Sequence, residues 1–235
     1  MVIWMSTYFI TAPILGNNQD RAFRLRRHWL KYVGIPILNL KIQVTGQAPQ
    51  AGNYLYISNH RSFSDPVVLC RYIDAFVIAK AEVAQYPIIN KGAELTGVLY
   101  VKRTDKSSRS ETRKLLVETI KNGRNILVYP EGTVSTTKHT LPFNPGTFHS
   151  AAEEGFGVVP VAIEYKDSSD LWFYPKFVRQ VFHQFSKWST HVKLEFGEVI
   201  YDNDGDQLRK RSEEWVNTTL DKMQANWATA QYFGE

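Results

Sequence analysis

Cysteine is almost absent from the sequence, since Cys70 is the only one among 235 residues. A single cysteine forms no disulfide within the chain and supplies no multi-cysteine metal site. Cys70 lies in the apolar run VVLCRYI, which predicts packing in the core rather than a role as nucleophile. We therefore expect no metal centre and no bound cofactor, and nothing indicates an oxidising compartment.

Several catalytic signatures are also missing. The sequence has no G-x-S-x-G, G-x-x-x-x-G-K-[ST], G-x-G-x-x-G or H-E-x-x-H motif. These absences disfavour serine hydrolases of the nucleophile-elbow type, P-loop nucleotide enzymes, dinucleotide-binding enzymes and zinc proteases. No internal repeat or Gly/Ser linker divides the chain, and 235 residues with 43% hydrophobic residues suit one domain with a substantial core.

The apolar start of the sequence is short for a membrane span. The first sixteen residues, MVIWMSTYFITAPILG, fall below the roughly 20 that cross a bilayer, and they contain several polar residues and a proline. They also lack the basic start of a secretory signal. We expect them to lie in the membrane interface or to pack on the domain.

Basic residues are concentrated near the N-terminus. Residues 1–40 contain five Arg and Lys residues against one acidic residue, while the whole chain has a net charge of +5. From Asp20 to Pro36 apolar residues recur at helical spacing, and cations gather on the other faces. The apolar positions are Ala22, Leu25, Trp29, Tyr32 and Val33, and the basic ones are Arg21, Arg24, Arg27, His28 and Lys31.

This pattern predicts a basic amphipathic helix, which is typical of a membrane-surface element but also of an ordinary surface helix. We predict that residues 1–40 form apolar and basic amphipathic membrane-associating helices and that residues 41–235 form the catalytic domain. The positive charge fits a phospholipid surface or a nucleic acid, and charge by itself does not distinguish them.

Alternating patterns fill the rest of the chain. Seven short apolar or alternating runs predict strands at 41–44, 54–57, 76–79, 98–101, 126–129, 158–163 and 192–200. Helical patterns lie at 66–73, 107–122, 146–154 and 207–230. The alternation predicts one α/β domain with a mostly parallel or mixed sheet covered by helices. The aromatic and basic stretch 167–188 is predicted to be an edge hairpin or a packed loop rather than a lipid-touching patch.

Polar residues follow four of the predicted strands. They are His60 after the second strand, Lys80 after the third, Arg103 after the fourth, and Glu131 with Gly132 and Thr133 after the fifth. The carboxyl ends of parallel strands meet at one edge of a sheet, where open α/β sheets bind ligands. We therefore expect a site at this edge, provided that these strands run parallel.

The stretch SNHRSFSDP at 58–66 places Asp65 five positions after His60. Asp65 followed by Pro66 is also typical of a helix start, in which the carboxylate accepts from free backbone N–H groups. A carboxylate has enough lone pairs to cap a helix and to hold His60, so the two interpretations are compatible.

Four blocks in order make the sequence resemble the glycerolipid acyltransferase family, whose members include 1-acyl-glycerol-3-phosphate acyltransferases. They are NHRSFSD (59–65), GVLYVKR (97–103), YPEGT (129–133) and VVPVAI (158–163). The resemblance implies a peripheral or monotopic enzyme on the cytoplasmic face of a membrane. Such an enzyme moves an acyl group from acyl-coenzyme A or acyl–acyl carrier protein to a lysolipid hydroxyl. It implies no nucleic-acid partner.

The resemblance also implies roles for individual residues. His60 is the general base, for which the reference pKa of histidine, about 6.5, is suitable, and Asp65 orients it. Arg103 contacts the phosphate of the acceptor, with Lys80 as a weaker candidate. Glu131, Gly132 and Thr133 line the acceptor site.

Two positions depart from the commonest family pattern. Val134 and Asn144 stand where many relatives have arginine and lysine, and Lys138 is a candidate to compensate for the missing charge. The EGTVS sequence followed by LPF resembles a branch that includes acyltransferases for lyso-ornithine lipid. The acceptor is thus 1-acyl-glycerol-3-phosphate or another lysolipid.

Two alternatives stay open from the residues. In the first, the same His–Asp pair activates water, and the protein is a thioester or phospholipid hydrolase. In the second, the chain is a basic module that binds a membrane or a nucleic acid, and the four blocks are only structural.

Overall fold

The computed structural model describes residues 11, 19–81, 97–101, 106–174, 177–225 and 227. Within these ranges seven strands form one sheet in the order β1-β7-β6-β2-β5-β3-β4. The strands are β1 (Leu40–Thr45), β2 (Leu55–Ser58), β3 (Ala75–Lys80), β4 (Val98–Val101), β5 (Asn125–Val128), β6 (Val158–Tyr165) and β7 (Thr190–Phe196). Each predicted strand overlaps one of these, so the strand predictions are confirmed.

The directions of the strands bring the carboxyl ends of β2, β3, β4 and β5 to one edge of the sheet. β2 pairs in parallel with β5 and β6, and β3 pairs in parallel with β4 and β5. Only β7 with its parallel partner β1 runs the other way, because β7 pairs with β6 in antiparallel fashion. The condition for a shared site at the ends of β2, β3, β4 and β5 is therefore met.

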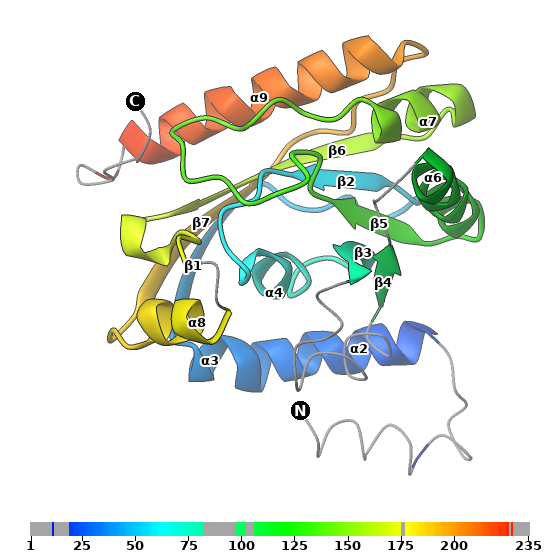
Figure 1. Cartoon of the computed structure of the whole chain (residues 1–235). Coiled ribbons are helices and arrows are strands. Elements are labelled where there is room, and N and C mark those ends of the chain that lie inside the picture. Colours follow the sequence, from blue (N-terminus) through cyan, green and yellow to red (C-terminus); the bar gives the residue numbers. More distant parts are fainter. Residues whose placement is uncertain are drawn as a thin grey trace.

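Helices cover both faces of the sheet (Figure 1). They are α2 (Gln19–Trp29), α3 (Ile35–Ile37), α4 (Asp65–Leu69), α6 (Lys106–Lys121), α7 (Gly146–Glu154), α8 (Phe177–Phe185) and α9 (Gly205–Ala225). Leu55 and Ile57 of β2 join one core with α6, α7 and α9, while Tyr56 joins the other core with α4. This alternation follows from the period of two in a strand.

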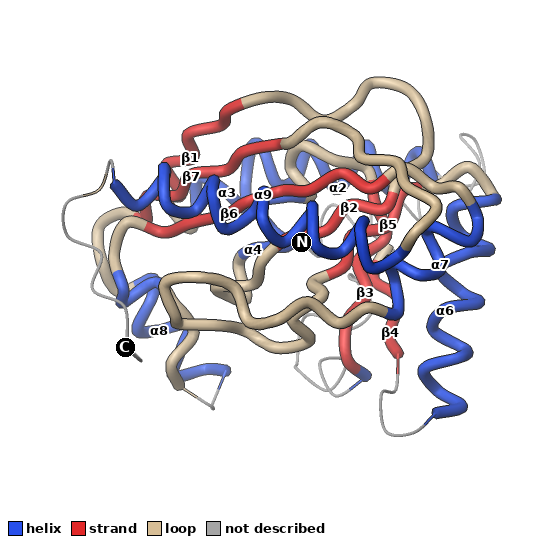
Figure 2. The backbone as a smooth tube through the Cα atoms, turned by 90° about the horizontal axis from the view of Figure 1, so that it is seen from above, coloured by secondary structure: helices blue, strands red, loops and turns tan. Residues whose placement is uncertain are grey.

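The predicted α/β domain with a mixed sheet is therefore confirmed. Figure 2 shows α9 extending along the strands, where it packs against β6. β6 is buried along its whole length because helices lie over both faces of the sheet, and this explains its almost continuous apolar sequence.

The N-terminal helix is present, but its buried face differs from the prediction. The buried positions of α2 are Arg21, Ala22, Phe23 and Arg26, whereas Tyr32 is exposed. Arg26 is buried because its guanidinium donates to the carbonyl oxygens of Ile73 at 3.1 Å and Ala75 at 3.0 Å. A pattern that treats every arginine as exposed therefore misplaces the packed face. The proposed boundary between residues 40 and 41 stays a prediction.

A π-helical turn, Leu30–Gly34, connects α2 to α3. Pro36 follows it, and a proline ring inside a helix displaces the carbonyl four residues earlier, which accounts for the widened turn. None of the helices in the described ranges combines the length and apolar character that a membrane crossing requires. Of the first sixteen residues only Thr11 is described, so the prediction for that segment lies outside the described residues.

The prediction of an edge hairpin or packed loop at 167–188 was wrong. This stretch contains a short 3-10 turn, Ser168–Asp170, and helix α8. Val178, Val181, Phe182 and Phe185 recur three or four positions apart, which is the period of a helix rather than of a strand.

Candidate active site

His60 and Asp65 form a close pair at the end of β2. The distance between His60 Nδ1 and Asp65 Oδ2 is 2.7 Å. The imidazole is 20% exposed while the carboxylate is fully buried at 0%. One edge of the ring is therefore held from inside the protein, and the ring still reaches the surface.

Three donors besides His60 bind the Asp65 carboxylate. Oδ2 also accepts from the backbone N–H groups of Arg61 at 2.7 Å and Ser62 at 2.9 Å, and Oδ1 accepts from the Tyr165 hydroxyl at 2.7 Å. Burial raises the pKa of Tyr165 well above its usual value, so this hydroxyl stays protonated and donates. An ionised carboxylate is an acceptor only, so Nδ1 of His60 carries the proton and Nε2 is the acceptor nitrogen of the neutral ring.

The capping part of the prediction for Asp65 was wrong. α4 begins at Asp65 and has Pro66 in its first turn, as predicted, but it has no hydrogen bond from a side chain at its N-terminus. The carboxylate points back to the loop before the helix instead. Residues 59–64, which we call the His60 loop, are thus folded around this one acceptor.

Glu131 reaches the His60 loop from the end of β5. Its Oε1 accepts from the backbone N–H of His60 at 2.7 Å, and its Oε2 accepts from the backbone N–H of Leu141 at 2.7 Å. Burial raises the pKa of Glu131 to about 7, although these two hydrogen bonds and the charge of Arg61 oppose the increase. Glu131 therefore connects the His60 loop to the segment around Leu141.

Tyr129, which directly follows β5, supports the imidazole. Its ring stacks on that of His60 with 4.1 Å between the centroids and 19° between the planes. The chain then turns at Gly132, whose φ of 76° lies in the left-handed region that favours glycine. This turn directs Glu131 inward, and Thr133 is exposed.

Arg61 is buried and holds a segment that follows the turn. Its guanidinium donates to the carbonyl oxygen of Lys138 at 2.8 Å and to Glu164 Oε2 at 3.2 Å. The same Glu164 oxygen accepts from Gln224 at 2.8 Å. The His60 loop, β6 and α9 thus meet in one buried polar network.

The other predicted residues are placed as follows. Lys80 and Lys138 are exposed, and Lys138 Nζ lies 3.7 Å from Asp221. Asn144 donates from its side chain to the carbonyl oxygen of Pro130 at 2.8 Å. Arg103 lies outside the described residues, so its predicted contact with a phosphate stays a prediction.

The sequence reasoning did not identify Tyr129, Tyr165 or Arg61 as site residues. Tyr129 and Arg61 lie inside the motif blocks, which was an available signal. Tyr165 follows the fourth block by two residues, and nothing in its local sequence distinguishes it from any other strand tyrosine.

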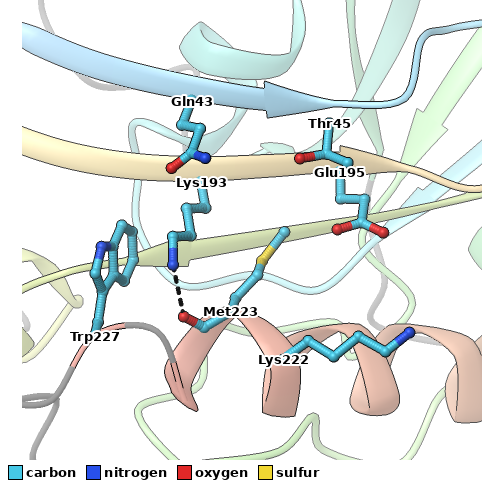
Figure 3. Close-up of a pocket in the computed structure, with 7 residues that line it drawn as sticks. All are labelled: Gln43, Thr45, Lys193, Glu195, Lys222, Met223 and Trp227. Atoms are coloured by element: carbon cyan, nitrogen blue, oxygen red, sulfur yellow. Dashed lines mark hydrogen bonds between the residues drawn. The ribbon is translucent and has the colours of Figure 1, made fainter.

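A separate hollow of about 290 Å³ lies between β1, β7 and the end of α9 (Figure 3). Lys193 points into it, donates to the carbonyl oxygen of Met223 at 2.9 Å and lies 4.2 Å from the centre of the Trp227 ring. None of its lining residues belongs to the four motif blocks. The hollow is therefore distinct from the site around His60.

Comparison with known proteins identifies the family. A sequence profile described as "Acyltransferase" matches residues 41–164, which is more than half of the chain. The chain belongs to the acyltransferase family. The resemblance that the four motif blocks indicated is thereby confirmed, and the matched range of this acyltransferase contains the His60 loop, Glu131 and Glu164.

Two of the relatives are named as acyltransferases of lysolipids. Lyso-ornithine lipid O-acyltransferase from Pseudomonas aeruginosa is 34% identical over 143 residues, covering 61% of this chain and 54% of that protein. 1-acyl-sn-glycerol-3-phosphate acyltransferase from Neisseria gonorrhoeae is 28% identical over 133 residues, covering 56% and 52%. The chain thus spans about half the length of the curated relatives that it matches.

A solved structure confirms the fold of this acyltransferase. The crystal structure of the 1-acyl-sn-glycerophosphate acyltransferase PlsC from Thermotoga maritima matches with a TM-score of 0.71. The match covers 97% of this chain and 91% of that one at 21% sequence identity. At this identity the comparison concerns the fold alone.

Proposed function

We propose that this protein transfers a fatty acyl group from an acyl thioester to the free hydroxyl of a lysolipid, with His60 as general base. The observation that supports this most is the geometry of His60. Its Nδ1 is bound by the buried carboxylate of Asp65 while the ring remains partly exposed. The acceptor nitrogen Nε2 can thus take a proton from a substrate hydroxyl.

The reaction needs no nucleophile from the protein. The acceptor oxygen bonds to the thioester carbonyl carbon while its proton passes to Nε2 of His60. The carbon–sulfur bond then breaks, and the imidazolium returns the proton to the leaving thiolate, so that one ester and one thiol form. Asp65 fixes the tautomer of the ring and stabilises the imidazolium.

The acyl donor in this proposal is acyl-coenzyme A or acyl–acyl carrier protein, and no bound cofactor takes part. The acceptor is 1-acyl-glycerol-3-phosphate, which gives phosphatidic acid. Exposed Lys80 at the end of β3 and Arg103 are the cations proposed to meet its phosphate. Glu131, Gly132 and Thr133 are proposed to form the wall of the acceptor site.

A second acceptor, lyso-ornithine lipid, is favoured by two observations. Val134 replaces a cation beside the acceptor wall, and the Pseudomonas aeruginosa relative with 34% identity is named for this lipid. Both acceptors are amphiphiles, so we further propose that the protein acts as a peripheral or monotopic protein on the cytoplasmic face of a membrane, with residues 1–40 in contact with lipid.

The test is a transfer assay with the purified chain. Labelled acyl-coenzyme A and acyl–acyl carrier protein are each offered with lysophosphatidic acid, with lyso-ornithine lipid or with no acceptor. We expect label in one lysolipid and a loss of at least about a hundredfold in His60→Ala, since a positioned base contributes roughly 10²–10⁴-fold.

The matched control is His149→Ala on α7. His149 also faces an aspartate, with 3.4 Å between its Nε2 and Asp206 Oδ1 of α9, but neither residue belongs to the four motif blocks. This variant should retain transfer. Free fatty acid released through His60 even in the presence of acceptor would replace the transferase by a hydrolase, and undiminished transfer by folded His60→Ala would refute the mechanism.

A further inference from the structure

Three large apolar side chains lie exposed within eleven residues of α8 and the turn after it. Val178 is 61% exposed, Phe182 is 71% exposed and Trp188 is 91% exposed. Single exposed apolar residues are common on protein surfaces, but a local group of them marks an interaction site. We call Val178, Phe182 and Trp188 the α8 patch.

The two faces of α8 have opposite character. Val178 and Phe182 are four residues apart and thus share the outer face, while Gln180 and Gln184 are buried on the inner face. Gln180 donates to the carbonyl oxygen of Leu171 at 2.8 Å. The outer face thus carries apolar groups where a helix on a soluble domain usually carries polar ones, while two amides are buried on the inner face.

The inner face of α8 holds the His60 loop. Gln184 Oε1 accepts from the Ser62 hydroxyl at 2.9 Å, and its Nε2 donates to the Ser64 hydroxyl at 3.2 Å. The ring of Phe185 meets that of Phe63 edge to face with 5.6 Å between the centroids. The α8 patch is therefore one helix thickness away from the loop that carries His60.

The charge around the α8 patch is positive. Residues 171–190 contain three basic residues and no acidic residue. Arg179 is exposed beside the patch, and its guanidinium lies 4.1 Å from the centre of the Tyr174 ring. Lys187 is paired with Asp167 and Asp170, so Arg179 is the exposed cation next to Val178.

The α8 patch lies close to the end of the N-terminal helices. Asn39 donates from its side chain to the Trp188 carbonyl oxygen, and the backbone N–H of Thr190 donates to the Asn39 carbonyl oxygen at 3.2 Å. Ile37 of α3, two residues before Asn39, is also exposed. Figure 1 shows α3 and α8 at the same end of the molecule.

We propose that the α8 patch is a membrane-docking surface that inserts into the interface of an anionic phospholipid bilayer. The occupant follows from the chemistry of the surface, because exposed Phe and Trp side chains in a segment with basic and no acidic residues, beside the exposed Arg179, match an anionic lipid interface. The proposal rests on the proposed function in one respect, namely that the acceptor is a lipid. Docking through α8 places the His60 loop next to the bilayer from which the acceptor comes.

The test uses the full chain with the double substitution Phe182→Ser and Trp188→Ser. Tyr201→Ser is the matched control, since Tyr201 is 60% exposed and lies four residues before α9, whose first turn is far from α8 in Figure 1. Binding is measured by flotation with vesicles of phosphatidylglycerol and phosphatidylcholine, and thermal unfolding checks that both variants fold. Residues 1–40 are unchanged in all three proteins, so any difference in vesicle binding between the proteins does not come from this segment.

We expect the double variant to bind anionic vesicles at least about tenfold more weakly, because burial of two aromatic side chains in the interface is lost. Tyr201→Ser should bind like the wild type. In the double variant, transfer to acceptor in vesicles should fall more than transfer to acceptor in detergent.

Equal vesicle binding by the double variant and the wild type would overturn the proposal. So would a change from dimer to monomer in gel filtration without a change in vesicle binding, because the patch would then bind a second copy of the chain. If the wild type transfers no acyl group, the proposed function fails, but flotation still decides whether α8 docks.

Discussion

Glu131→Gln separates the effect of burial on this carboxyl group from its role as a hydrogen-bond acceptor. The two oxygens of Glu131 each accept one backbone N–H, from His60 and from Leu141. A glutamine has only one oxygen, so one of the two donors then faces an amide group that cannot accept. Losing a hydrogen bond to a charged group costs roughly 1.5–3 kcal/mol.

The pH dependence follows from the raised pKa of Glu131. Burial brings this pKa from the ordinary 4.5 to about 7, so the folded state holds the proton more tightly than the unfolded state. The group thus contributes stability that is fully present below pH 4.5 and is lost as the pH rises through about 7. A difference of about 2.5 pH units corresponds to about 3 kcal/mol, of which about 2 kcal/mol falls between pH 5.5 and pH 8.

Because glutamine does not titrate, we expect the free energy of unfolding of Glu131→Gln to rise relative to the wild type by about 2 kcal/mol between pH 5.5 and pH 8. Its acyl transfer should nevertheless be weaker, since the backbone N–H of His60 or of Leu141 loses its acceptor and the His60 loop is then held less firmly. Urea unfolding followed by tryptophan fluorescence measures the first effect, provided that the dependence on urea has the same slope in both proteins.

Glu153→Gln, on the exposed side of α7, corrects for the general loss of one surface carboxylate. A difference between Glu131→Gln and the wild type that stays constant within about 0.5 kcal/mol across this pH range would refute the reasoning, because burial would then not govern the titration of Glu131.

The remaining predictions concern two buried side chains. Tyr165→Phe removes the hydroxyl that donates to Asp65 at 2.7 Å. We expect kcat to fall about tenfold with little change in KM, because the orientation of His60 is disturbed while the acceptor site is unchanged. An unchanged kcat would contradict this role of Tyr165. Arg26→Met removes both hydrogen bonds to the carbonyls of Ile73 and Ala75 and should lower the free energy of unfolding by about 2–4 kcal/mol. Substitution of the exposed Arg24 by Met should change it by less than about 0.5 kcal/mol. Urea unfolding of the two variants measures this, and equal effects of both substitutions would show that Arg26 is not a buried anchor.

The sequence by itself determined the strands, the helices α2, α4, α6, α7 and α9, and the pair of His60 and Asp65. Strands and helices are read from the period of apolar residues, which is a local property. The pair is local too, because five positions of one loop bring an imidazole and a carboxylate within reach. Helix α8 was not predicted although its apolar residues have a helical period, because the aromatic residues and Pro175 of this stretch favoured a strand or a loop.

Only the tertiary structure decided what surrounds that pair. β2 lies between β5 and β6 in the sheet, although these strands are about 70 and 100 residues away along the chain. This order brings Glu131 to the backbone of His60 from one side and Tyr165 to the carboxylate of Asp65 from the other. Strand order depends on long-range pairing, and no local pattern encodes which strands become neighbours.

The burial of Arg26 and the outward apolar face of α8 have the same origin. Each depends on which surface faces the helix after folding, and the carbonyls of residues 73 and 75 make a buried arginine favourable at a position that the apolar pattern does not include. The motifs thus located the candidate active site, and the packing of distant strands and helices set its geometry, which includes the contacts of α8 with the His60 loop.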